Sequence, residues 1–407
     1  MYDLAVIWSW LEFAVRWLHV ITAVAWIGSS FYFIALDLGL WRDRNLASGA
    51  DGEEWQVHGG GFYHVQKYLV APAQMPDHLV WFKWESYSTW LSGAALLMIV
   101  YWAGGELYLI DHAKTDLSLF AAIVISAASL TVGWVLYDTL CKSALEDRPT
   151  VLMLLLFVIL VIMSWGYNQV FTGRAALLHL GAFTATIMTA NVFFIIMPNQ
   201  RIVVADLKAG RAPDAKYGKI AKLRSTHNNY LTLPVIFLML SNHYPLAFGT
   251  PYSWLIAALV FLMGVTIRHY FNTMHARQGA PNWTWAATAV IFVLIMALSS
   301  VPPAHVEEAY EDAAVPAHLK PVVTAEGYGA VKDIVLGRCS MCHAPEPSYD
   351  GILWPPKMVR LDTDTEIARN ARLIYLHSGI STAMPPGNVT WMEPAERAMI
   401  IAWYKGL

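Results

Sequence analysis

The sequence predicts an all-α protein in which a polytopic membrane bundle of about eight helices is followed by a small soluble helical domain. Three observations support this prediction. The 407 residues are 57% hydrophobic and only 14% charged, whereas an average soluble protein is about 25% charged. Eight apolar stretches reach or approach the ~20 residues that cross a bilayer. Beyond residue 301 the composition becomes polar.

The eight apolar stretches define the predicted transmembrane helices. Tryptophan and tyrosine gather at their ends, as membrane interfaces favour. The sixth stretch is the shortest and contains Pro234, which disfavours a regular helix interior. Because no cleavable signal peptide precedes the first stretch, that stretch is expected to act as its own export signal. The predicted helices span residues 17–40, 84–104, 117–140, 151–170, 175–197, 230–246, 254–271 and 283–301.

Lysine and arginine are concentrated on one side of this arrangement. One set of connecting segments contains fifteen of them, with Arg224 and Arg268 counted among these, whereas the opposite set contains only Arg16, Lys114 and Arg174. Because cytoplasmic loops are enriched in these residues, the first set is predicted to be cytoplasmic. Both termini are then expected on the periplasmic, outer side of a bacterial inner membrane.

The chain divides into three parts. Residues 1–301 form the predicted membrane domain, and residues 302–323 form a linker rich in proline, alanine and glutamate. Residues 324–407 have the pattern and length of one small helical domain that needs a cofactor to fold well. Cys141, outside that domain, is expected to be an inert thiol.

The C-terminal part contains the run C-S-M-C-H, which is typical of covalent c-type haem attachment. Cys339 and Cys342 would form the two thioethers, and His343 would be the proximal iron ligand. A zinc site would need two further ligands, and only His377 follows. The motif predicts a class I cytochrome c domain, and its attachment chemistry requires the outer side of the membrane, where the charge distribution also puts it.

The sixth iron ligand is predicted to be Met384. It lies in "STAMPPGN", where the prolines keep the backbone out of a helix. A thioether on such a loop suits a Met/His cytochrome. The alternatives are Met358 and Met392, and a buried hydrophobic role is the other interpretation of Met384.

Three histidines of the membrane part fall toward the predicted outer side, namely His19, His179 and His243. Ionisable residues inside membrane spans are costly and often functional. Two of them, with His19 and His179 ahead of His243, would suit a second, non-covalent b-type haem. The alternative is that each is an interfacial histidine bonded to a carbonyl group or water.

The cytoplasmic side has a different composition. "WFKWESYSTWLSG" contains Lys83 and Glu85 among three tryptophans, and "RSTHNNYLTLP" contains His227 and Asn228. Amides and charged groups beside aromatic faces suit a flat, anionic heterocycle. Lys83, Glu85, His227 and Asn228 are therefore the candidate catalytic residues. An aromatic belt with ordinary positive-inside charges is the alternative. The net charge of −3, without a basic run, argues against a nucleic-acid partner.

The whole chain resembles the membrane-bound bacterial urate hydroxylases of the PuuD type. The resemblance is carried by "GGGFYHVQKYLVAP", "WFKWESYSTWLSG", "STHNNYLTLPVIFLMLSNHYP" and the closing "CSMCH" and "MPPGN". It implies oxidation of urate, with water, to 5-hydroxyisourate, and electron transfer through the fused cytochrome c to a downstream acceptor of the respiratory chain. It also implies haem roles for Cys339, Cys342, His343 and Met384. No urate-contacting residue carries over.

A second function is compatible with the same sequence features. A membrane cytochrome subunit that oxidises quinol and relays electrons to a separate oxidase would have the same haem motif and the same apolar helices. Such a protein would be reduced by a quinol and would be indifferent to urate.

Overall fold

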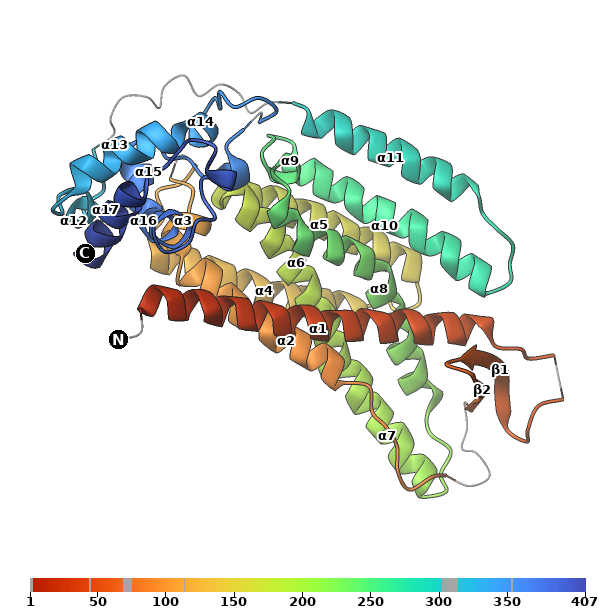
Figure 1. Ribbon diagram of the computed structural model, residues 1–407. Coiled ribbons are helices and arrows are strands. Elements are labelled where there is room, and N and C mark those ends of the chain that lie inside the picture. The colour runs from red at the N-terminus through yellow and green to blue at the C-terminus, as the bar shows by residue number, and fades with distance from the viewer. Residues whose placement is uncertain (1–2, 44, 69–74, 113, 302–313, 353) are drawn as a thin grey trace.

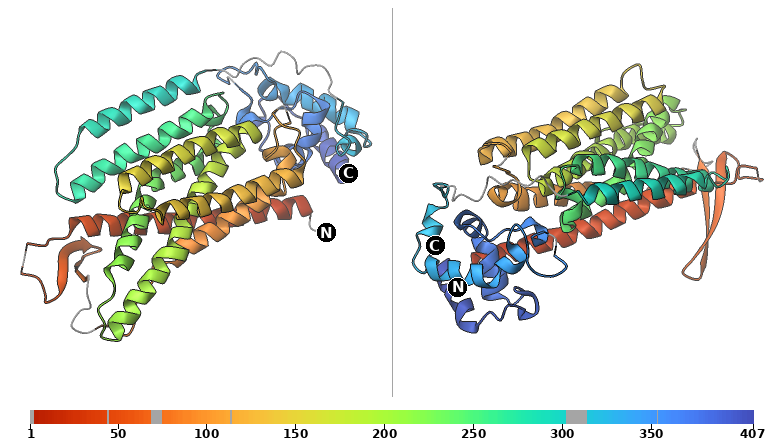
Figure 2. Two further views of the ribbon diagram at one scale, coloured as in Figure 1. Left: turned by 180° about the vertical axis from the view of Figure 1, so that it is seen from behind. Right: turned by 90° about the horizontal axis from the view of Figure 1, so that it is seen from above.

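The computed structural model describes residues 3–43, 45–68, 75–112, 114–301, 314–352 and 354–407. Long helices lie side by side in one bundle, and a small C-terminal domain sits at one end of it (Figure 1). The N-terminus lies at that same end, and a β-hairpin lies at the opposite end (Figures 1 and 2). We call these the haem-motif end and the hairpin end.

Each of the eight predicted stretches overlaps a helix of the bundle, although the bounds of the helices differ. In the described residues they are α1 (Leu4–Gly39), α2 (Trp84–Leu96) with the π-helical turn η1 (Leu97–Trp102), α4 (Leu119–Cys141), α5 (Pro149–Val170), α6 (Gly173–Ala190) with the π-helical turn η2 (Asn191–Ile196) and α7 (Met197–Lys208), α8 (Ala215–Leu240), α10 (Ser253–His275) and α11 (Trp283–Ser299). Short elements connect them: α3 (Gly105–Tyr108), the 3-10 turn η3 (Ser241–His243) and α9 (Pro245–Phe248).

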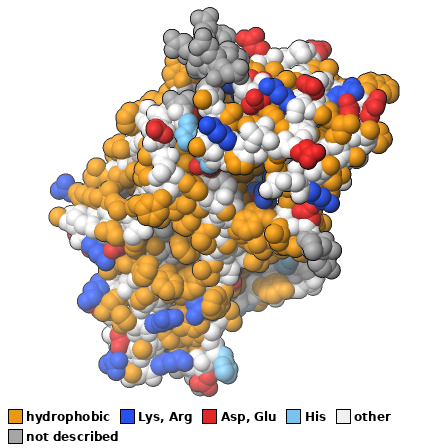
Figure 3. Space-filling view, turned by 90° about the vertical axis from the view of Figure 1, so that its left-hand side faces the viewer, with side chains coloured by type: hydrophobic (Ala, Val, Ile, Leu, Met, Phe, Trp, Pro, Cys, Tyr) orange, Lys and Arg blue, Asp and Glu red, His pale blue; other side chains and the backbone are white. Residues whose placement is uncertain are grey.

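Within the described ranges, five helices are long and apolar enough to cross a membrane. They are Leu4–Gly39, Leu119–Cys141, Pro149–Val170, Gly173–Lys208 and Ser253–His275. Large apolar side chains such as Leu154 and Ile162 are exposed on the bundle, and hydrophobic side chains are numerous on the face that Figure 3 shows. A soluble protein rarely exposes so large an apolar surface, so this part of the chain is suited to a lipid bilayer.

Several helices extend beyond the apolar stretches, because polar residues cap them. Asp3 caps α1 by accepting a hydrogen bond of 2.9 Å from the Ala5 amide, so the helix begins well before residue 17. Asp214 caps α8 in the same way, at 2.9 Å from the Lys216 amide. Pro234 lies inside α8 without ending it. Capping groups satisfy amides that otherwise have no partner at a helix start.

The described residues also contain a β-hairpin, which the all-α prediction missed. Strand β1 (Ala50–His58) pairs antiparallel with β2 (Gly61–Tyr68). Gly59 and Gly60, with φ of 59° and 81°, form the turn. Two consecutive residues with positive φ are what a two-residue hairpin turn requires. The glycine run was therefore a turn signal between two strands.

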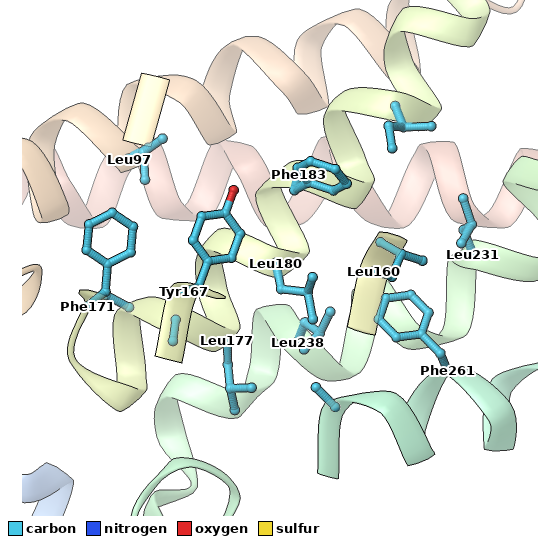
Figure 4. Packing of buried hydrophobic residues seen from close by; sticks show 14 of the residues in the cluster. Leu97, Leu160, Tyr167, Phe171, Leu177, Leu180, Phe183, Leu231, Leu238 and Phe261 are labelled. Atoms are coloured by element: carbon cyan, nitrogen blue, oxygen red, sulfur yellow. The ribbon is translucent and has the colours of Figure 1, made fainter. Parts of the chain in front are cut away.

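The bundle has a continuous apolar core. Figure 4 shows aromatic and leucine side chains from several helices meeting in its centre, including Tyr167, Phe171, Phe183, Leu180 and Leu238. Most of these come from α5, α6 and α8, so α6 is the central helix around which the others pack.

The C-terminal domain has a separate core. Its elements are α12 (Lys320–Val323), α13 (Tyr328–Arg338), α14 (Ser340–His343), the 3-10 turn η4 (Pro356–Met358), α15 (Asp364–Arg369), α16 (Ala371–Ile374), the π-helical turn η5 (Tyr375–Ile380), the 3-10 turn η6 (Pro386–Asn388) and α17 (Pro394–Lys405). Val335, Met392, Ile400 and Trp403 are among its buried residues. Val322 in α12 accepts a hydrogen bond from Trp403 at 3.3 Å. Residues 320–323, assigned to the linker from sequence, therefore pack with this domain, while residues 302–313 lie outside the described part.

Among the described residues, two polar contacts join the bundle to the C-terminal domain. Tyr375 of η5 donates a hydrogen bond to Asp3, the capping residue of α1. Glu106 of α3 lies 3.7 Å from His318. Both contacts are at the haem-motif end, so the first helix and the C-terminal domain share one side of the bundle.

Two of the arginines counted as loop residues lie inside the protein. Arg224 is only 1% exposed and belongs to α8, and Arg268 is 5% exposed and belongs to α10. The count of cytoplasmic basic residues was therefore too high by two. The remaining thirteen still outnumber the three on the opposite side, so the predicted orientation does not depend on them.

Candidate functional site

A cavity of about 500 Å³ lies in the hairpin half of the bundle. Its walls come from α1, from the segment before α2 and the start of α2, from the α6–α7 helix and from α8. Binding sites for small molecules are typically about 300–1,000 Å³, so this cavity has room for a heterocycle with water. We call it the main cavity.

The main cavity combines aromatic faces with polar groups. Trp26 and Phe33 line it from α1, and Trp81 and Phe82 line it from the segment before α2. Flat rings of this kind stack on a planar ligand. Polar side chains of the same cavity, including Glu85, Gln200 and Asn228, supply hydrogen-bonding groups.

Two carboxylates line the main cavity: Asp37, which pairs with Lys67, and Glu85. Glu85 is the one without an ion pair in the described residues. It stands in the first turn of α2, where the helix dipole favours a negative charge. Its Oε2 atom is fully enclosed and has no hydrogen-bond partner within the described residues. A buried carboxylate oxygen without a partner costs free energy, so Glu85 has hydrogen-bonding capacity that the described residues leave unused.

The amides of the main cavity come from Asn228 and Gln200. Asn228 donates from Nδ2 to the Met188 carbonyl oxygen at 2.9 Å. Its Oδ1 accepts a hydrogen bond of 2.9 Å from Asn191 Nδ2. One amide hydrogen and one lone pair of Asn228 remain, and both of these suit the edge of a purine-like ring.

Asn191 lies at the centre of a buried polar network behind the cavity. It also donates to the Tyr137 hydroxyl oxygen at 3.1 Å, and it accepts from Arg224 at 3.2 Å. Arg224 in turn pairs with Asp138 at 2.7 Å. The network is formed by α4, η2 and α8, and it holds the Asn228 side chain in one orientation.

Asn191 opens the π-helical turn η2. Such turns are rare and occur often at functional sites. Sequence reasoning missed Asn191 and Tyr137, because it examined ionisable residues within the spans. An amide inside the apolar run "TATIMTANVFFII" was the signal that would have found the network.

The other two candidate catalytic residues do not line the main cavity. His227 is buried beside Tyr137, whose hydroxyl group lies 2.8 Å from its Nδ1 atom. Its Nε2 atom is enclosed and has no partner in the described part of the chain. Lys83 lies outside, with its ammonium group 5.7 Å from the centre of the Trp84 ring. The structure therefore brings Glu85 and Asn228 together and separates Lys83 and His227 from them.

The three histidines proposed for a b-type haem lie in three different surroundings. His179 is fully buried, and both of its ring nitrogens are engaged, at 2.8 Å from the Ala175 carbonyl oxygen and 2.8 Å from Ser126 Oγ. The Phe171 ring centre lies 4.7 Å from it. Haem ligation by His179 would require its hydrogen bond with Ser126 to break, and that role stays a prediction.

His19 and His243 differ from His179. His19 donates from Nδ1 to the Thr89 carbonyl oxygen at 3.0 Å, and its ring packs against Gly93, where a Cβ atom would come within 2.9 Å of it. His243 is exposed in η3. Haem ligation by either residue stays a prediction.

The haem-attachment motif lies at the other end of the bundle. Cys339 follows α13, and Cys342 and His343 belong to the single turn α14. His343 donates from Nδ1 to the Val359 carbonyl oxygen at 2.7 Å. This bond fixes the ring and leaves Nε2 as the free lone pair, which is the arrangement that iron-binding histidines use. Burial lowers the pKa of His343, which favours the neutral ring that binds iron. The residues present therefore fit a c-type haem.

Met384 is on the loop after η5 and is 36% exposed, whereas Met392 is only 2% exposed and belongs to the domain core. Met358 packs near Gly249 of the membrane domain. Of the three methionines, Met384 alone combines an accessible loop position with freedom from these packing roles in the described residues.

Burial raises the pKa of the Cys339 thiol to about 12.

The main cavity and the haem motif are far apart along the bundle. Ser30 lines the cavity and Asp3 contacts the C-terminal domain, and both belong to the same helical segment. At 1.5 Å per residue they are separated by ~40 Å. Substrate chemistry at the main cavity and electron acceptance at the motif would therefore take place at opposite ends.

These features define a class of protein: a polytopic helical membrane protein with an aromatic and polar cavity in the bundle and a small helical domain at one end. The chain belongs to the urate oxidase N-terminal family, whose model matches residues 5–299. No curated protein and no solved structure matches the chain. Membership of this family indicates that the protein is an oxidoreductase and that its reaction is an oxidation related to urate. The matched residues cover the bundle from Ala5 to Ser299.

Proposed function

We propose that this protein oxidises urate to 5-hydroxyisourate in the main cavity and passes the electrons to a c-type haem held by its C-terminal domain. The proposal depends chiefly on one observation. In a chain of the urate oxidase N-terminal family, the main cavity places the enclosed oxygen of Glu85 and the oriented amide of Asn228 among aromatic rings. That combination suits a planar, electron-rich purine.

Urate is a monoanion near neutral pH, and it stacks on aromatic faces. In the proposed site, Trp81 and Phe33 provide those faces, and the free lone pair and hydrogen of Asn228 meet the ring edge. Asn191 fixes which way the Asn228 amide points. A ligand held this way is oriented before reaction, which is a large part of catalysis.

Glu85 is the proposed proton acceptor. Urate and one water molecule together lose two electrons and two protons to give 5-hydroxyisourate. Glu85 Oε2 accepts a proton either from urate or from the water that adds at C5. Such general-base assistance typically contributes about 10²–10⁴-fold. Its lack of a partner in the described residues means that no existing hydrogen bond has to break first.

The C-terminal domain supplies the electron acceptor in this proposal. Cys339 and Cys342 would hold the haem covalently, and His343 and Met384 would bind its iron. When bound, such a group would accept one electron at a time, so it would be reduced twice for each urate. Because the cavity and the motif lie at opposite ends of the bundle, a carrier between them is part of this proposal, and the b-type haem expected from the sequence would serve. The Val359 carbonyl oxygen orients the His343 ring for this role.

All eight long helices are proposed to cross the bacterial inner membrane. An even number of crossings puts the N-terminus and the C-terminal domain on one side, which agrees with their shared end of the bundle (Figure 1). The charge distribution makes that side periplasmic. The main cavity then lies toward the cytoplasm, and electrons leave for a respiratory acceptor on the outer side.

The test is an absorption spectrum of purified, oxidised, detergent-solubilised protein, recorded anaerobically before and after addition of urate. Reduction of the c-type haem by urate, and not by xanthine or buffer, is the expected result. A haem that stays oxidised with urate but is reduced by a quinol would overturn the proposal and establish the quinol relay.

A further inference from the structure

The main cavity has a charge balance that does not favour an anion by itself. Its lining contains two carboxylates, Asp37 and Glu85, and Lys67 is the one lysine or arginine among the described residues that line it. Like charges at close range repel, and a cation nearby offsets that repulsion. A purine anion in this cavity therefore depends on Lys67 for a favourable interaction of charge.

Lys67 does not belong to the bundle. It lies in strand β2 of the hairpin, where it is paired with Gly52 of β1. The hairpin lies beside the C-terminal end of α1 (Figure 1), and Tyr32 of α1 donates a hydrogen bond of 2.7 Å to Gln56 of β1. The hairpin thus adds a cation to a cavity that is otherwise lined by helices and by the segment before α2.

Lys67 stands at the open end of the main cavity. Its ammonium group pairs with Asp37, and the two side chains are 32% and 42% exposed. Asp37 follows Phe33 by four residues in α1, so the two side chains are neighbours on one face of that helix. Trp26 lines the cavity about three helical turns before Asp37. A ligand stacked on the Phe33 ring therefore has the ammonium group near its edge.

The ion pair between Lys67 and Asp37 is one of several contacts that hold the hairpin in place. Backbone hydrogen bonds of 2.9 and 3.0 Å join Glu53 of β1 to Trp41, two residues after α1. The bond from Tyr32 to Gln56 adds to them. Since a partly exposed ion pair contributes little to stability, the position of the hairpin does not require the charge of Lys67.

The ammonium group of Lys67 has hydrogen-bonding capacity left. It carries three hydrogens, and within the described residues it donates to Asp37. The hydrogens that remain can be donated to a ligand while the bond to Asp37 is kept. A compact ammonium charge of this kind suits an anionic oxygen or a deprotonated ring nitrogen.

From these observations we infer that Lys67 determines the specificity of the main cavity for the charge of its substrate. Its ammonium group bonds to Asp37 and to the anionic edge of urate together, so the cavity selects a purine anion over a neutral purine of similar shape. Asp37 shares the cation with the substrate and therefore weakens the binding of the anion. The inference rests on the proposed function, and it makes the hairpin part of the substrate site.

The experiment measures urate binding without turnover. Full-length protein is kept reduced with dithionite under anaerobic conditions, so that it cannot oxidise urate, and affinity is measured by equilibrium dialysis. Lys67→Met keeps the aliphatic stem and removes the charge. It is expected to weaken urate binding by about tenfold or more, because a hydrogen bond to a charged group is lost. Binding of hypoxanthine, a neutral purine, should change much less.

Lys114→Met is the matched control. The side chain of Lys114 is also 32% exposed and also pairs with an aspartate, Asp111, at 3.3 Å. It lies in the connection between α3 and α4, and it does not line the main cavity. Lys114→Met should leave the affinities for urate and for hypoxanthine unchanged.

Asp37→Asn is the second variant, and it keeps the inference testable if Lys67→Met does not fold. It breaks the same ion pair but leaves the cation in the cavity. Urate affinity should rise by about two- to fivefold, which is the effect of losing a competing, partly exposed ion pair. A purely structural ion pair predicts instead that Asp37→Asn and Lys67→Met both weaken binding.

Three results would overturn the inference, and they are distinguishable from failure of the proposed function. Lys67→Met might bind urate as the wild type does, or lose urate and hypoxanthine to the same extent, or Asp37→Asn might weaken urate binding. If urate still reduces the haem of the wild-type protein in any of these cases, the proposed function stands. If wild-type protein neither binds urate nor is reduced by it, the proposed function fails and the role of Lys67 fails with it.

Discussion

Asn191 Nδ2 donates a hydrogen bond of 2.9 Å to Asn228 Oδ1, and this bond connects a π-helical turn to α8 behind the main cavity. A residue that does not line the cavity thus decides how the cavity presents an amide. The same Asn191 bonds to Tyr137 and Arg224.

The variant Asn191→Asp should test the orientation of the Asn228 amide separately from the stability of the fold. The new carboxylate keeps an acceptor for Arg224 but has no hydrogen to donate to Asn228. We therefore expect a nearly unchanged melting temperature and a KM for urate raised by about tenfold, which corresponds to the ~1.5 kcal/mol of a typical hydrogen bond. Urate-dependent haem reduction measures KM and kcat. Asn242→Ala, at a buried amide outside this network, is the control and should leave KM unchanged.

Glu85→Gln should lower kcat by about 10²–10⁴-fold, because a glutamine cannot accept the proton. Urate affinity should change little, since the two side chains have the same shape. Anaerobic single-turnover reduction of the haem measures the step. Glu106→Gln, at a carboxylate of the haem-motif end that faces His318, is the control. Unaltered kcat in Glu85→Gln would rule out Glu85 as the base.

Replacing either Cys339 or Cys342 by serine should leave at most one thioether and reduce covalent haem. Cys141→Ser should not, since Cys141 is buried in the bundle near Arg224. Haem staining of denatured protein on a gel gives the answer directly. Covalent haem retained in the double Cys339→Ser, Cys342→Ser variant would contradict the assignment.

Replacing Met384 and replacing Met392 by alanine should have opposite effects on the haem potential and on the stability of the domain. Met384→Ala removes the proposed axial thioether, so the haem potential should fall with little loss of stability, since Met384 is partly exposed. Met392→Ala opens a cavity in the domain core and should cost about 2–5 kcal/mol of unfolding free energy. Its haem potential should not change. Redox titration and thermal unfolding of both variants separate the two effects.

The contact between Asp3 and Tyr375 should make the attachment of the C-terminal domain sensitive to acid. The hydrogen bond from Tyr375 lowers the pKa of Asp3, and burial, with this bond, raises the pKa of Tyr375 to about 12. A lowered carboxyl pKa stabilises the fold above the unfolded value of about 3.9 and loses that effect as the pH falls through the folded value.

The Asp3→Asn variant tests this directly. Wild-type protein should lose melting temperature between pH 5 and the folded pKa of Asp3, and the variant should lose less over the same interval. If the two proteins follow parallel curves, then Asp3 does not contribute to the acid response.

The sequence alone was sufficient for the long helices, because each requires only a continuous apolar run and flanking polar residues. It also located the C-x-x-C-H motif, whose spacing is local. The hairpin was not predicted, although Gly59 and Gly60 form its turn and two consecutive glycines indicate a turn. Its strands are polar and lie outside the bundle core, so they lack the strong apolar alternation that identifies a strand.

Which polar residues meet was decided only by the tertiary structure. Successive residues of a helix point about 100° apart, so Asn228 faces the main cavity while His227, its neighbour, faces Tyr137. Similarly, Arg224 has a carboxylate partner 86 residues away, and Arg268 has none within the described residues. Sequence determines the helices and the haem motif because both are local patterns. The cavity and the charge balance around each arginine depend on side chains from distant helices, which only packing brings together.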